Sequence, residues 1–155
     1  MSKTEKAYVA AGCFWGIQEA FRVLPGVIET NVGYAGGKTK NPTYDDVCTG
    51  KTGHAETVEI EFDPTKVSYA QILDTFWEIH DPTTLDAQGP DIGSQYRSAI
   101  FYTNEEQRKI AEKSKESLEQ SGKFAGQVVT EITHLDPKNF YLAEEYHQKY
   151  ICKTG

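Results

Sequence analysis

The sequence is poor in cysteine, and its few cysteines are not paired. Its 155 residues contain three, Cys13, Cys48 and Cys152, which are widely spaced and form no C-x-x-C motif. This odd, scattered set excludes a disulfide-rich scaffold and does not fit a zinc site. The four histidines also show no ligand spacing to one another or to the cysteines. We therefore expect no bound metal.

Long apolar runs and an excess of positive charge are missing too. No apolar stretch approaches the ~20 residues that a membrane helix needs. Lys and Arg number 16 against 23 Asp and Glu, a net charge of -7, which argues against nucleic acid or an anionic membrane as a partner. Residues 1–6 lead into no apolar signal region. The sequence therefore predicts one cytoplasmic domain over residues 1–155. We expect a monomer, although these features do not determine the oligomeric state.

The most informative stretch that is present surrounds Cys13. The apolar run at residues 8–11 reads as a buried strand, and Phe14, Ile17 and Phe21 then recur at helical spacing. Cys13 thus lies at a strand-to-helix junction, where helix N–H groups and the helix dipole favour a thiolate. Phe14 and Trp15 lie roughly 100° apart on such a helix, so one of them is left to line a surface or pocket beside the sulfur. The alternative is a buried structural cysteine.

A second candidate is Glu56, at the start of a strand predicted over 54–62. Val58, Ile60 and Phe62 share one face of that strand, and one step back along this face is Glu56. Desolvation there would favour the protonated carboxylic acid, which can serve as a general acid. The alternative is that the strand begins at Thr57 and that Glu56 is a solvated loop residue.

The order of elements predicts an α/β (α+β) two-layer sandwich. Its core is a ferredoxin-like βαββαβ sheet, followed by an extra helix, a strand and a C-terminal helix. Right-handed crossovers place the first and third strands side by side and antiparallel, so Cys13 and Glu56 could meet. The expected strands are 7–11, 27–34, 54–62, 97–102 and 128–135, and the expected helices are 14–24, 69–80, 104–121 and 138–150.

Several local features sharpen this outline. In the second strand, Ile28, Thr30, Val32 and Tyr34 are expected to share one face. Capping boxes are predicted at Ser68–Gln71 and Thr103–Glu106. The long loop at 35–53 carries an aromatic residue, a proline and a cysteine, so it is expected to be ordered and functional. Asp91 lies in a second, polar loop over 81–95, where a merely solvated residue is the alternative.

The chemistry that these residues suggest is nucleophilic. A thiolate, a carboxylic acid and an aromatic slot suit an apolar electrophile with a basic oxygen, such as a sulfoxide. The residues alone do not select a sulfoxide over a thioester, an amide or a peroxide. A hydrolase built on Cys13, His54 and Glu56, and a binding module with an inert thiol, both remain as alternatives.

Several motifs together resemble one enzyme family. The stretches at 12–16 (GCFWG), 33–37 (GYAGG), 41–44 (NPTY), 53–56 (GHAE), 91–98 (DIGSQYRS) and 145–148 (EYHQ) are similar to those of the A-type peptide methionine sulfoxide reductases. The resemblance covers nearly the whole chain. It implies reduction of the S epimer of methionine sulfoxide, free or in proteins, and we expect no cofactor.

The resemblance also implies roles for individual residues. The nucleophile would be Cys13 and the proton donor Glu56, with Tyr44 and Tyr96 hydrogen-bonding the sulfoxide oxygen. The methyl pocket would be formed by Phe14 and Trp15, and Asp91 would orient the substrate. Methionine would leave behind a sulfenic acid on Cys13, which a second thiol and then a reductant such as thioredoxin would reduce.

The resolving thiol is the point at which the sequence departs from the common pattern. Many members of the family carry resolving cysteines on a longer, glycine-rich tail, whereas here Cys152 lies a few residues from the end. We expect Cys152 to resolve Cys13. The alternative is a one-cysteine enzyme that is reduced directly by an external thiol. Cys48 is expected to be a small buried residue.

Overall fold

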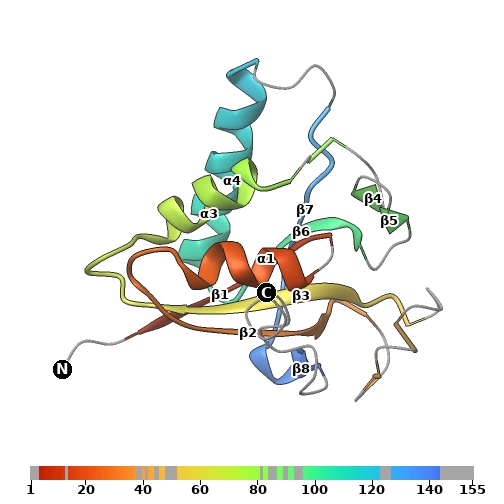
Figure 1. The fold of residues 1–155 in the computed structure, drawn as a ribbon. Coiled ribbons are helices and arrows are strands. Elements are labelled where there is room, and N and C mark those ends of the chain that lie inside the picture. Colours follow the sequence, from red (N-terminus) through yellow and green to blue (C-terminus); the bar gives the residue numbers. More distant parts are fainter. Residues whose placement is uncertain are drawn as a thin grey trace.

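The computed structural model contains a six-stranded sheet with helices on one face (Figure 1). It describes residues 4–12, 14–37, 40, 42–43, 46–47, 52–80, 82–83, 87–88, 91–92, 96–122 and 127–143, with only the backbone at 14–16, 87–88 and 91–92. The strands are β1 (Glu5–Ala11), β2 (Val27–Ala35), β3 (Ala55–Phe62), β4 (Ala87–Gln88), β5 (Asp91–Ile92), β6 (Ser98–Tyr102), β7 (Glu131–His134) and β8 (Tyr141–Leu142). The helices are α1 (Phe14–Arg22), α3 (Tyr69–Glu78) and α4 (Glu105–Gln120), with a 3₁₀ turn, η2, at Pro137–Asn139.

The strand order confirms the predicted ferredoxin-like connectivity. It runs β7-β6-β1-β3-β2-β8, and β1 pairs antiparallel with both β3 and β6. β7 joins parallel to β6 after the α4 crossover, and β8 joins antiparallel to β2. β4 and β5 form a separate two-stranded sheet. The two central strands are therefore β1, the first strand of the chain, and β3.

The two faces of the sheet are covered by different parts of the chain. The helices cover one face, where Phe21 of α1 and Phe76 of α3 are fully buried against Ile60 of β3 and its neighbours. The other face carries Tyr8 and Phe101, over which the segment of η2 and β8 packs with Phe140 (Figure 1). In the described part of the chain, no helix combines the length and the apolar character needed to cross a bilayer.

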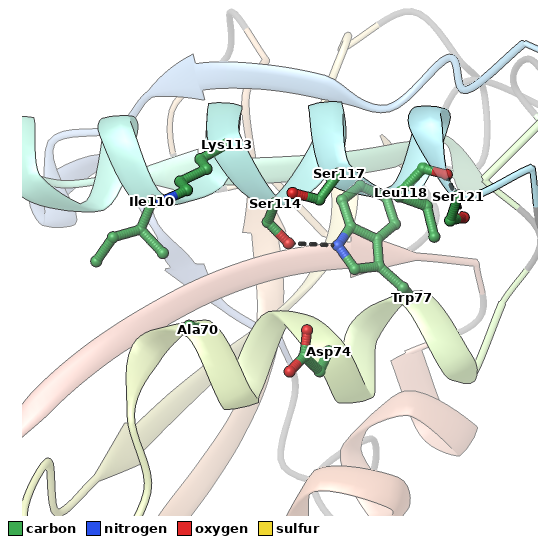
Figure 2. A pocket seen from close by; sticks show the side chains of 9 residues that line it. All are labelled: Ala70, Asp74, Trp77, Ile110, Lys113, Ser114, Ser117, Leu118 and Ser121. Carbon is green, nitrogen blue, oxygen red and sulfur yellow. Dashed lines mark hydrogen bonds between the residues drawn. The ribbon is translucent and has the colours of Figure 1, made fainter.

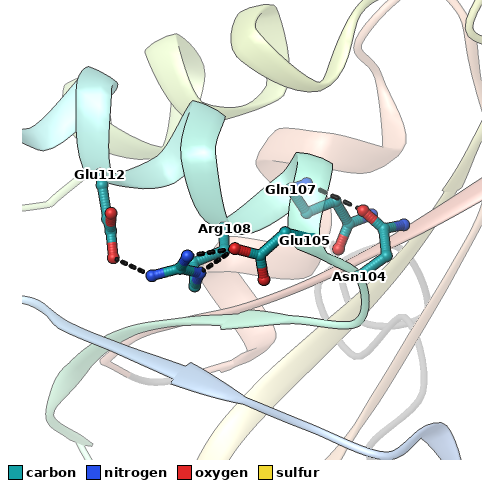
Figure 3. A network of polar contacts seen from close by, with 5 residues as sticks. All are labelled: Asn104, Glu105, Gln107, Arg108 and Glu112. Carbon is teal, nitrogen blue, oxygen red and sulfur yellow. Dashed lines mark hydrogen bonds and ion pairs between the residues drawn. The ribbon is translucent and has the colours of Figure 1, made fainter.

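Helix caps fix the starts of α3 and α4. The capping box at Ser68–Gln71 is confirmed. For α4 the prediction was one residue off: the N-cap is Asn104, whose side chain accepts a hydrogen bond from the Gln107 backbone N–H at 2.8 Å (Figure 3). Gln107 in turn accepts from the backbone N–H of Thr103 at 2.9 Å. Asn at the cap position satisfies an orphan helix N–H as well as Thr does, so the pattern allowed either start.

Charged residues on the outer face of α4 are paired with one another. Arg108 lies between Glu105 and Glu112, one turn away on either side, and forms an ion pair with each (Figure 3). Both pairs are solvent-exposed, so they contribute little to stability.

Two further sequence predictions were wrong. The helix expected from residue 138 is instead the short turn η2, capped by Asp136, followed by β8. Pairing with β2 holds residues 141–142 extended, and this tertiary contact overrides local helix preference; residues 144–150 lie outside the described ranges. Ile28 does not share the buried face of β2: it is 56% exposed, because a register shift between Val27 and Glu29 bulges the strand.

Candidate active site

The candidate site lies at the end of the sheet where β1 and β2 finish and β3 begins, at the right of Figure 1. Glu56 is 1% exposed and lies on the helix-covered face with Val58 and Ile60. Its cross-strand partner on β2 is Tyr34, also fully buried. The prediction that Glu56 points inward is confirmed, and a solvated loop position is excluded.

The same end of the sheet carries the junction at which Cys13 was predicted. β1 pairs with β3 through Val9 and Val58, and the next step in this register puts Ala11 opposite Glu56. Gly12 follows with φ of 100°, a left-handed conformation that favours glycine. α1 then begins at Phe14. The strand–turn–helix junction is thus confirmed, whereas the placement of Cys13 lies outside the described residues.

The register extends this site across the sheet. Ala11 also pairs with Ser98, the first residue of β6. Because directly opposed residues share a face of the sheet, Ser98, Ala11, Glu56 and Tyr34 lie side by side on the helix-covered face. We call these four residues the site row.

The other predicted residues are described to different extents. Tyr96 is partly buried and lies two positions before β6. Asp91 begins β5, opposite Gln88 of β4, but nothing is described of its side chain. Phe14 and Trp15 open α1, again with only their backbone described. Tyr44, Cys48 and Cys152 lie outside the described residues.

His54, part of the rival hydrolase interpretation, makes structural contacts. Its ring is buried and lies edge-on to Tyr141, with centroids 5.6 Å apart. The Nδ1 atom accepts a hydrogen bond from the Gly37 backbone N–H at 3.1 Å. In a neutral ring the proton is then on Nε2, so neither nitrogen is left to deprotonate a thiol. This arrangement does not favour a Cys–His hydrolase.

Sequence reasoning missed a polar cluster beside the site row. Ser98 Oγ lies 2.7 Å from His80 Nε2 and 2.7 Å from Thr130 Oγ1. His80 follows α3, and Thr130 precedes β7. No spacing rule links three residues so far apart in sequence; the only hint was a serine at an inward position of a predicted strand.

A well-formed hollow lies elsewhere in the fold. It measures about 620 Å³ between α3 and α4 and contains no predicted site residue (Figure 2). Trp77 lines it and donates a hydrogen bond from Nε1 to Ser114 Oγ at 2.8 Å. Within the described ranges, no three His, Cys, Asp or Glu side chains are grouped as they would be around a metal ion.

Comparison with known proteins gives a consistent result. A family model described as peptide methionine sulfoxide reductase matches residues 5–155. A peptide methionine sulfoxide reductase MsrA from Methanothermobacter thermautotrophicus is 58% identical over 155 residues, 99% of this chain and 90% of that protein. One from Methanosarcina mazei is 60% identical over 151 residues, 97% of this chain and 71% of that protein.

Solved structures agree with the sequence comparison. Mxr1 from Saccharomyces cerevisiae in its reduced form has a TM-score of 0.91 at 35% identity, covering 98% of this chain and 86% of that one. Mxr1 in complex with Trx2 has a TM-score of 0.67 at 25% identity, covering 96% of this chain and 85% of that one. The fold is thus shared over nearly the full length of the chain.

Proposed function

The chain belongs to the peptide methionine sulfoxide reductase family, and from this premise we propose that the site row, together with Cys13, forms its active site. The protein is an oxidoreductase that uses thiols to reduce methionine sulfoxide to methionine. The observation that carries our assignment is the buried Glu56 next to the end of β1. A carboxyl group so far from water favours its neutral, proton-donating form.

The first stage of the proposed mechanism takes place at the sulfoxide sulfur. The Cys13 thiolate attacks this sulfur while Glu56 donates a proton to the oxygen. This attack forms a bond between the two sulfurs, and that bond breaks as the protonated oxygen passes from the substrate sulfur to Cys13. The substrate sulfur keeps the electron pair and leaves as methionine, and Cys13 becomes a sulfenic acid. The start of α1 favours the thiolate form that this attack needs.

The remaining predicted residues hold the substrate. Tyr44 and Tyr96 donate hydrogen bonds to the sulfoxide oxygen and assist its protonation by Glu56. Phe14 and Trp15 enclose the methyl group, and Asp91 orients the substrate. The position of Tyr96 just before β6 supports its role, because Ser98 of that strand belongs to the site row.

The second stage restores the thiolate. The Cys152 thiol condenses with the sulfenic acid, which forms a Cys13–Cys152 disulfide and releases water. An external dithiol such as thioredoxin then reduces the disulfide. The solved complex of Mxr1 with Trx2 supports a reductant of this kind. We further propose that residues 1–155 act as one monomeric, cytoplasmic domain and reduce the S epimer both free and in proteins.

The test is a product and thiol count. Fully reduced protein receives excess methionine S-sulfoxide without reductant, and methionine and lost thiols are quantified by intact mass and peptide mapping. We expect about one methionine per protein and a Cys13–Cys152 disulfide. The Cys48→Ser variant is the matched control and should behave as the wild type does.

Other outcomes would correct the proposal at separate points. If no methionine forms, the assignment of the active site is refuted. If methionine forms but only Cys13 is oxidised, Cys152 is not the resolving thiol. In that case Cys152→Ser would also keep its full turnover with thioredoxin.

A further inference from the structure

His80 is held in one orientation by contacts on both sides of its ring. The Nδ1 atom lies 2.6 Å from the carbonyl oxygen of Phe76. The ring stacks near Trp77, with an interplanar angle of 17° and centroids 6.2 Å apart, and its centroid is 4.3 Å from that of Phe76. Because a carbonyl oxygen can only accept, Nδ1 carries the proton, and in the neutral ring Nε2 is the acceptor.

This tautomer determines the direction of the hydrogen bonds that follow. Ser98 donates its hydroxyl proton to Nε2, and Thr130 then donates to Ser98 Oγ. Lys115 adds a hydrogen bond from Nζ to the carbonyl oxygen of Thr130 at 3.2 Å. The end of α3, the start of β6 and the approach to β7 are thereby connected by a partly buried chain of hydrogen bonds.

This chain of hydrogen bonds includes a residue of the site row, Ser98. Ser98 is 3% exposed and is two strands away from Glu56, with only the methyl group of Ala11 between them. At the usual strand spacing this separation is about 10 Å. Tyr96, which we propose to hydrogen-bond the sulfoxide oxygen, lies two residues before Ser98, so its backbone is anchored where Ser98 is anchored.

We propose that His80 is a positioning residue for sulfoxide reduction: through Ser98 it fixes the start of β6 and with it the backbone that presents Tyr96 to the substrate. The inference rests on the proposed role of Tyr96. Ser98 is not itself a nucleophile, although a serine paired with a histidine suggests one, because it is buried and its hydroxyl is bonded to both His80 and Thr130. His80 and Thr130 hold the Ser98 side chain in place.

Two substitutions of His80 test its contact with Phe76 and its contact with Ser98 separately. His80→Gln can place an amide near Nε2 and keep the contact with Ser98. His80→Asn can keep the contact with the Phe76 carbonyl but is too short to reach Ser98. We expect His80→Asn to lower the single-turnover rate of sulfoxide reduction about tenfold and His80→Gln to stay within about threefold of the wild type. Ser98→Ala removes the same contact from the other side and should match His80→Asn.

The decisive measurement is a double-mutant cycle with Tyr96→Phe. If His80 acts through Tyr96, the tenfold loss caused by His80→Asn disappears once the Tyr96 hydroxyl has been removed. Ser114→Ala is the matched control, since it removes a partly buried hydrogen bond between this serine of α4 and Trp77 of α3, the helix that His80 follows. It should lower the melting temperature and leave the rate unchanged.

The outcomes distinguish this inference from the function on which it rests. A wild-type protein that forms no methionine refutes the proposed function and the role of His80 with it. If the wild type is active, two results would refute the role of His80 and leave the proposed function standing. One is a tenfold loss by His80→Asn that persists in the Tyr96→Phe background. The other is a full rate in both His80→Asn and Ser98→Ala. A Tyr96→Phe variant with unchanged rate also overturns the role of His80.

Discussion

Replacing Glu56 with Gln should separate activity from stability. The buried acid is neutral in our mechanism, so an uncharged amide of the same shape fits the same space without leaving a new charge in the core. We expect the free energy of unfolding at pH 7 to change by less than about 1 kcal/mol. The amide cannot donate its proton to the sulfoxide oxygen, and loss of a general acid slows a reaction by about 10²–10⁴-fold. This corresponds to about 2.7–5.4 kcal/mol of transition-state stabilisation.

Glu59 provides a matched control on the opposite face of the same strand. It accepts hydrogen bonds from the Tyr8 hydroxyl at 2.7 Å and the Asn31 side chain at 3.1 Å, and Lys6 lies 3.8 Å away. Glu59→Gln removes the charge from this cluster and keeps only one oxygen, which should cost about 1–2 kcal/mol of stability. Its rate should equal that of the wild type, because the cluster does not face the site row.

The two assays are single-turnover methionine formation and urea unfolding. We expect Glu56→Gln to be slow in methionine formation but as stable as the wild type, and Glu59→Gln to be as fast as the wild type but less stable. A Glu56→Gln protein that keeps its full single-turnover rate would remove Glu56 from the chemistry. A gain of several kcal/mol in its stability would show that the native carboxyl is charged, and the proton-donor role would fail for that reason.

Three further predictions concern the scaffold. In Gly33→Ala, the new Cβ would overlap the Tyr141 carbonyl oxygen, so β8 must shift. The free energy of unfolding in urea should then fall by about 1–3 kcal/mol, and an unchanged unfolding midpoint would contradict this packing. Burial and the Glu59 hydrogen bond raise the pKa of Tyr8 above its ordinary value of 10.0. The unfolded chain therefore releases this proton first, and stability should decline as pH rises above 10.0, less steeply in Tyr8→Phe. Asn104→Ala removes the α4 cap and should lower stability by about 1 kcal/mol, a fall of about 2–4 °C in melting temperature; no change would show that the cap is dispensable.

The parts of the site that the sequence predicted depend on regular periodicity. The two-residue period of β3 was sufficient to predict that Glu56 points inward. The handedness of crossovers was sufficient to predict that β1 pairs with β3. Both rules act over whole elements, so they tolerate errors of one residue at an element's end. The same tolerance explains why the α4 cap was shifted by one residue while the topology was correct.

The parts that the sequence could not predict depend on tertiary contacts. Phe140 and Tyr141 fit a helical stripe as well as they fit an edge strand, and pairing of Tyr141 with Tyr34 decided between them. The bulge at Ile28 likewise follows from the register of β2 on β3. His80 and Ser98 are 18 positions apart, and their hydrogen bond depends on where α3 ends above the sheet. No local pattern encodes such a contact.

The central place of β1 has a consequence for synthesis on the ribosome. This strand is made first, yet its two neighbours, β3 and β6, come from later parts of the chain, and the second of them ends at Tyr102. At 5–20 residues per second, translation leaves the apolar run ending at Ala11 without both partners for roughly 5–20 seconds. An unpaired apolar strand is prone to aggregate. The nascent chain therefore carries β1 with at least one unpaired edge through most of translation. The site row cannot assemble until β6 has emerged.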